Sequence, residues 1–230
     1  MNQDLYTAGM NTAAGTLLLT AVLVVWRREL RAMVMLLACQ GVALAALPIV
    51  DGIAHASAEV IGVGVAILAL RGVVLPAVLL RLVARRGPAR RGPARWVPAR
   101  RESAPVVGTS LSLLITALLT VTAFAVTRPI VRLQATVGSM AVPVSFAVIL
   151  IGIQVMATRR RALSQTVGFL MLDNGITSAA FLLTSGVPLV VELGASLDVL
   201  FVTLVLGLLA RQVQAHFGDS DVGRLRELRD

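Results

Sequence analysis

The chain has 230 residues, of which 57% are hydrophobic and 14% are charged. Its mean hydropathy is +0.86, a composition that soluble globular domains rarely have. The net charge of +9 comes from arginine, since the chain contains no lysine. Only 4% of the residues are aromatic, so platforms for stacking bases are lacking and nucleic-acid binding is not expected.

Apolar runs close to the length of a membrane span recur along the chain, which predicts an all-α, polytopic membrane helix bundle. We expect about seven transmembrane helices. In chain order they are residues 8–25, 33–50, 60–82, 106–126, 138–157, 166–184 and 188–210.

The arginines gather in alternate connections between these spans. Because cytoplasmic loops carry the positive excess, this pattern places the N-terminus outside and the C-terminus in the cytoplasm of a multi-pass protein of the cell membrane. The richest connection, RRGPARRGPARWVPARRE, repeats a Gly-Pro-Ala-Arg unit that cannot be helical and that can attract anionic lipids. It divides the chain into a three-helix segment (1–84), a linker (85–105), a four-helix segment (106–212) and a cytoplasmic tail (213–230).

Four ionisable residues fall inside the predicted spans: Arg71, Asp173, Glu192 and Asp198. Each costs at least about 2.5 kcal/mol at the bilayer centre, so such groups normally face protein or water. Arg71 is too deep to reach the interface, and Pro76 removes the backbone hydrogen bond to residue 72, which favours a kink beside it. A structural ion pair with one of the acids and a fixed charge that tunes a neighbouring carboxylate are compatible interpretations.

Asp173 is followed by Asn174 and Gly175, which are poor helix formers, near the middle of the sixth span. The run predicts a local helix break, or a later start of that span, or close helix packing at Gly175.

In the seventh span Pro188 suits the first helical turn and Glu192 lies between Gly186 and Gly194, a spacing suited to tight packing. Asp198 lies about 9 Å deeper than Glu192 at about 1.5 Å per residue. Carboxylates on two adjacent helices at different depths are more typical of a proton path than of a metal site, which needs converging oxygens. No catalytic motif accompanies them, so we expect no metal and no catalysis by this chain alone.

The stretch DNGITSAAFLLTSGVPLVVELGASLDVL resembles the two-helix signature of hydrogenase-4 component E, in which Glu-Asn-Gly precedes Val-Glu-Leu-Gly and a following Asp. The tail RLRELRD is similar to that family's C-terminal Leu-Arg-Glu-Leu-Arg, and LRGVVLPAVLLRLV resembles its lysine-containing helix. That family is itself related to the K subunit (chain 4L) of complex I and to the C subunit of multisubunit sodium/proton antiporters.

The resemblance implies a non-redox membrane subunit of a group 4 hydrogenase or complex I-like oxidoreductase. Asp173 and Glu192 would take the positions of two membrane glutamates in a path for protons, or for sodium, and Asp198 that of the family's aspartate. The chain would hold no cofactor, with NiFe and iron–sulfur centres in hydrogenase-like subunits and with antiporter-like subunits beside it. The alternatives are a structural scaffold of the membrane arm, a subunit of a cation/proton antiporter, or an independent transporter.

Overall fold

The computed structural model describes residues 2–85, 108–133, 141–159, 161–184 and 207. These residues are helical apart from short connections, and Met1–Ser196 is one compact unit. Five helices of the described ranges are long and apolar enough to cross a membrane, and a sixth is apolar but shorter. The predicted class, a polytopic membrane helix bundle, is therefore confirmed, while the number of spans and the orientation stay predictions.

Each of the first six predicted spans has its counterpart, and the third is built from three consecutive helical elements. The helices are α1 (Gln3–Trp26), α2 (Leu30–Ala54), α3 (Ala58–Ile67), η1 (Leu68–Val74), α4 (Leu75–Arg85), α5 (Thr109–Leu133), α6 (Val142–Thr158) and α7 (Ala162–Thr184). Apart from Gly207, the seventh predicted span and the tail lie outside the described residues, as does almost all of the linker.

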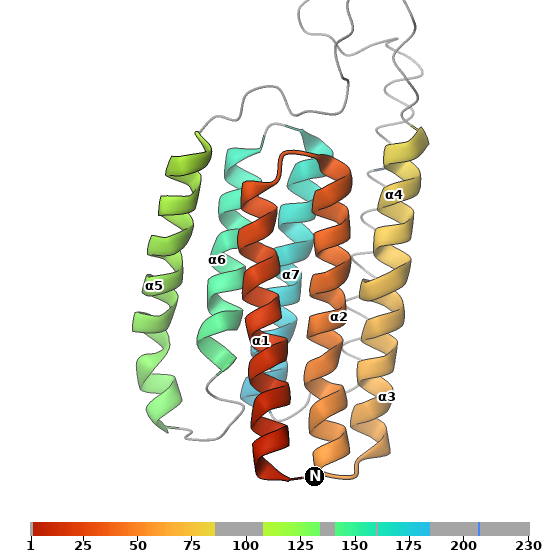
Figure 1. Cartoon of the computed structure of the whole chain (residues 1–230), viewed down its shortest axis with the longest axis vertical. Coiled ribbons are helices and arrows are strands. Elements are labelled where there is room, and N and C mark those ends of the chain that lie inside the picture. The colour runs from red at the N-terminus through yellow and green to blue at the C-terminus, as the bar shows by residue number, and fades with distance from the viewer. Residues whose placement is uncertain (1, 86–107, 134–140, 160, 185–206, 208–230) are drawn as a thin grey trace, which may run out of the picture. The chain divides into compact units, whose positions relative to one another are not determined.

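Helices that are consecutive in the sequence pack side by side: α1 with α2, α2 with α3, α5 with α6, and α6 with α7 (Figure 1). In addition α1 packs against α6 and α2 packs against α7. The helices that precede the arginine-rich linker therefore share one core with those that follow it. Large apolar side chains such as Met10, Leu17, Met33, Leu44 and Ile151 are almost fully buried in that core.

Glycines allow the closest of these contacts. A Cβ atom on Gly152 of α6 would lie 2.7 Å from the backbone nitrogen of Leu172 on α7. A Cβ atom on Gly41 of α2 would lie 2.5 Å from the carbonyl oxygen of Arg71 in η1. Because backbone atoms cannot move aside as a flexible side chain can, only glycine fits at these two crossings.

We expect Gly152→Ala to destabilise the bundle by about 1–3 kcal/mol, because the added methyl group would overlap the α7 backbone. Thermal unfolding of the purified protein in detergent measures the effect. The matched control is Gly15→Ala in α1, where the added atom meets nothing within 4 Å. If the two variants melt at the same temperature, the close contact between α6 and α7 is wrong.

Candidate functional site

Arg71 lies halfway along the third span, in the π-helical turn η1. At the end of this turn the amide of Leu75 donates to the carbonyl of Leu70, five residues earlier. Pro76 follows at once, and because it has no amide hydrogen it cannot donate to Gly72. The sequence signal for a kink is thus expressed as a widened turn, a feature that often occurs at functional sites.

The guanidinium of Arg71 forms an ion pair with Asp173 on α7. Its Nη1 lies 2.8 Å from Oδ2 of Asp173. The Arg71 side chain is 2% exposed and that of Asp173 is 18% exposed. The ion pair expected from the sequence is therefore present, and it joins two elements that are about a hundred residues apart in the chain.

Two amide side chains extend the ion pair into a buried network. Nη1 of Arg71 also donates to Oδ1 of Asn174 at 2.8 Å, and Nδ2 of Asn174 donates to Oε1 of Gln40 on α2 at 3.1 Å. Nε2 of Gln40 donates to the carbonyl of Leu17 on α1 at 3.3 Å. One chain of polar contacts thus crosses α7, η1, α2 and α1, and each of its members lies in the middle part of its helix.

α7 continues without interruption through Asp173, Asn174 and Gly175, so the expected break and the later start of this span are both absent. The helix is kept because Asn174 bonds to other elements through its side chain while its backbone stays helical. Gly175 lies at the crossing with α6, where a Cβ atom would be 2.8 Å from the side chain of Ile149. The glycine therefore serves close packing.

The network is stable because breaking any one of its contacts would leave a buried charge or a buried amide without a partner, which is costly in free energy. In a low-dielectric interior, removing one partner of a buried ion pair typically costs about 3–5 kcal/mol, because the remaining charge is uncompensated. An amide left without its partner costs about 1–3 kcal/mol. The register of the four elements is thereby coupled, since a shift of any one of them separates donors from acceptors.

The remaining candidates from the sequence belong to the seventh predicted span and its approach. These are Gly186, Pro188, Glu192, Gly194 and Asp198, and they lie outside the described residues. The roles expected for them, proton transfer by Glu192 and Asp198 and close packing or helix breaking by the glycines and the proline, stay predictions.

Sequence reasoning missed Gln40, although an amide in the middle of the apolar run LLACQGVALAAL was a visible signal. A second amide, Gln154 of α6, was also missed. Its Nε2 donates to the carbonyl of Ser112 at 2.7 Å, and its Oε1 accepts from the hydroxyl of Thr116 at 3.0 Å. This contact joins α6 to α5 and is separate from the network around Arg71.

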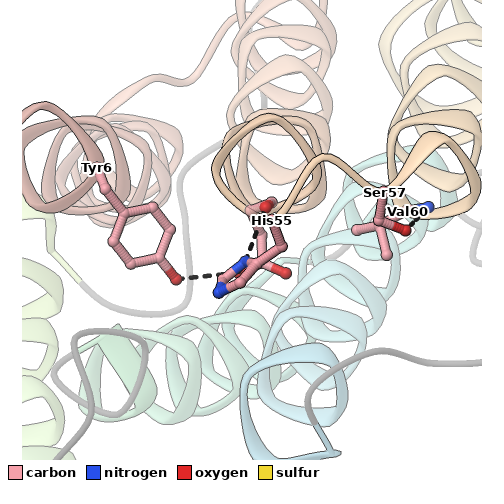
Figure 2. A network of polar contacts seen from close by, with 5 residues as sticks. Tyr6, His55, Ser57 and Val60 are labelled. Atoms are coloured by element: carbon pink, nitrogen blue, oxygen red, sulfur yellow. Dashed lines mark hydrogen bonds and ion pairs between the residues drawn. The ribbon is translucent and has the colours of Figure 1, made fainter. Parts of the chain in front are cut away.

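A third polar cluster, also missed, lies where α1 begins and α2 ends. The hydroxyl of Tyr6 donates to Oδ1 of Asp51 at 3.0 Å, and Nδ1 of His55 lies 3.3 Å from the same oxygen. Figure 2 shows Tyr6 and His55 on neighbouring elements. It also shows the start of α3, where the hydroxyl oxygen of Ser57 accepts a hydrogen bond from the backbone amide of Val60. The spacing of Asp51 and His55, four residues apart on one helix, was the available signal.

The fold and the buried ion pair define a class: a multi-pass helical membrane protein with a charged network inside its bundle. The chain is 56% identical over 218 residues to the uncharacterized protein Rv0085 of Mycobacterium tuberculosis, covering 95% of this chain and 94% of the relative. The chain therefore belongs to the same family as protein Rv0085.

A more distant similarity links the chain to hydrogenase-4 component E of Escherichia coli and of Shigella flexneri. The identity is 30% over 122 residues, which is 53% of this chain and 56% of those proteins. The chain thus spans about half the length of these relatives. No family model matches the sequence, and no solved structure matches it.

We expect Gln40→Leu to lower the free energy of unfolding by about 1–3 kcal/mol, because Asn174 and the Leu17 carbonyl would each lose a partner. Thermal unfolding in detergent measures the loss. Gln3→Leu is the matched control, since Gln3 is exposed at the start of α1 and should change stability by less than about 0.5 kcal/mol. Equal stability of both variants would contradict the network.

Proposed function

We propose that the chain is a non-redox membrane subunit of a hydrogenase-like or complex I-like oxidoreductase, in which Asp173 exchanges protons during translocation coupled to electron transfer. The observation that carries the proposal is the ion pair of Arg71 and Asp173 halfway through the bundle. A carboxylate at this depth is costly unless it is paired. A site kept in spite of that cost is a functional candidate.

The two partners of the pair have different chemistry. Arginine keeps its charge under almost any condition, so proton exchange at this site falls to Asp173. Arg71 would act as a fixed countercharge, held in place by the amides of Asn174 and Gln40. A lysine at its position could itself release a proton, which arginine cannot do.

A change in the Arg71–Asp173 separation would alter how strongly Asp173 holds a proton. The segment that would move is the widened turn η1, because it carries Arg71 and because Pro76 interrupts its hydrogen bonding. Redox chemistry in partner subunits would drive that movement. NiFe and iron–sulfur centres are proposed only for those partners, beside antiporter-like subunits in the same membrane arm, and sodium in place of the proton is the variant of this proposal.

The similarity to hydrogenase-4 component E supports membership of such a complex. In the resemblance Asp173 stands where the family pattern has Glu, and Arg71 stands where it has Lys. The shorter side chain of Asp173 and the permanent charge of Arg71 together favour a close ion pair, in agreement with their 2.8 Å contact. Glu192 and Asp198 are proposed as the further acids of the path.

The alternative is a structural scaffold whose acids pair with cations of partner subunits. The ion pair with Arg71 argues against this alternative for Asp173, since this acid already has a cationic partner within the chain. A purely structural role of the Arg71–Asp173 pair within the bundle is the remaining form of the scaffold hypothesis, and the following experiment separates it from proton transfer.

In the intact complex reconstituted in liposomes, we expect Asp173→Asn to reduce electron-transfer-coupled proton uptake at least about tenfold, because an amide cannot carry a proton. Electron transfer itself should continue. The matched variant is Asp173→Glu, which restores a carboxylate and should recover most of the uptake.

Three results are distinguishable in that experiment. If Asp173→Asn assembles and pumps like the wild type, the proton-path role is wrong. If both variants fail to assemble, the pair is structural and the scaffold alternative holds. If the protein purifies without partner subunits and transports a solute by itself, membership of an oxidoreductase complex is wrong.

A further inference from the structure

One face of α1 stays exposed although the helix packs against α2 and α6 on other sides (Figure 1). Its exposed residues recur about every three or four positions, so they form one stripe along the helix: Ala8, Asn11, Thr12, Gly15 and Leu19. A Cβ atom added at Gly15 would meet nothing within 4 Å. The opposite face, which includes Met10 and Leu17, is buried in the core. This α1 stripe is therefore an open surface of mostly small side chains around one amide.

Two aromatic residues indicate the level of the α1 stripe in the membrane. Tyr6 and Trp26 lie near the two ends of α1, and the roughly 20 residues between them span about 30 Å at about 1.5 Å per residue. This length matches the hydrocarbon core of a bilayer, at whose boundaries tyrosine and tryptophan are enriched. Arg27 follows Trp26, and Tyr6 contacts the carboxylate of Asp51, so charged groups occur at both levels. Asn11 then lies about 8 Å inside the hydrocarbon core.

Asn11 differs in its hydrogen bonding from the hydroxyl residues beside it. The hydroxyl of Thr12 donates to the carbonyl of Ala8 at 2.7 Å, and that of Thr16 donates to the carbonyl of Thr12 at 2.8 Å. These hydroxyls are thus satisfied within their own helix. The side-chain amide of Asn11 has two N–H donors and one acceptor oxygen, and no residue in the described ranges bonds to it. Because lipid tails offer neither donors nor acceptors, an amide that faces them is costly.

We propose that the α1 stripe docks a transmembrane helix of a neighbouring, non-identical subunit, and that this helix places an amide, hydroxyl or carboxyl side chain opposite Asn11. Ala8 and Gly15 lie about one turn before and one turn after Asn11, so the incoming helix can approach closely at the level of the amide. Small residues that allow close approach, together with polar side chains that bond across the contact, are the two features of helix association in membranes. The inference rests on the proposed function, since only a subunit of a membrane complex has such neighbours.

Two other occupants of the α1 stripe are less favoured. Lipid tails would leave the amide of Asn11 unpaired. A second copy of the chain, inserted in the same orientation, would place Asn11 opposite itself at the same depth, and the two amides could pair. The proposed membership of a multisubunit complex favours a different chain, and the experiment distinguishes all three occupants.

The test places a photoreactive phenylalanine derivative at position 11 of the full-length chain in cell membranes and identifies the crosslinked partner by mass spectrometry. We expect a crosslink to a transmembrane peptide of another subunit that carries an amide, hydroxyl or carboxyl side chain. Asn11→Leu should weaken retention of that subunit in mild detergent about three- to tenfold, because one hydrogen-bonded contact between membrane helices is lost. Its thermal unfolding as a single chain should not change, because Asn11 is exposed there.

The matched control is Thr12→Val on the same stripe, which removes a hydroxyl that is already satisfied within α1 and should retain the neighbour like the wild type. Equal retention by Asn11→Leu and Thr12→Val would overturn the proposal. If the complex assembles but position 11 reaches only lipid or a second copy, the docking surface is wrong while the proposed function stands. If no complex is found and position 11 reaches only lipid or a second copy, both are wrong.

Discussion

The requirement that buried charges and amides be paired in a low-dielectric interior governs the middle of this bundle. Arg71 meets that requirement by contacting Asp173 and Asn174 at 2.8 Å each. The amide of Asn174 in turn donates a hydrogen bond to Gln40, and the amide of Gln40 donates to a backbone carbonyl of α1. Four helical elements are therefore tied to one another by directional contacts, whereas apolar packing inside a membrane would permit them to slide.

The close backbone contacts serve the same arrangement. Gly41 lets α2 approach the backbone of Arg71, and the residue before it, Gln40, belongs to the network. Gly175 lets α7 approach α6, and the residue before it, Asn174, also belongs to the network. In both helices an amide and a glycine are adjacent, so the polar contact and the close approach occur at the same level of the bundle.

The two charged regions of the described bundle have different consequences. In the interior, Arg71 has a carboxylate partner, which makes the pair a candidate for proton exchange by Asp173. At the end of the bundle, Arg28 donates to the hydroxyl of Thr109 in α5, and Arg159 donates to the carbonyls of Val24, Val25 and Arg27, so these arginines join segments that are far apart in the chain. Arginine thus forms an ion pair in the interior and donates to the carbonyls that end a helix at the rim of the bundle.

The sequence by itself determined the membrane class, the approximate positions of six apolar helical segments and the presence of Arg71 and Asp173 inside two of them, because apolar run length and the rarity of embedded charge are local signals. Of its alternatives for Asn174–Gly175, close packing agrees with the structure and a helix break does not, since helix propensity ignores the partners that other helices supply. Only the tertiary structure decided that Arg71 pairs with Asp173 and that Gln40 completes the network. These contacts join residues more than 100 positions apart, and their formation depends on how helices pack in three dimensions.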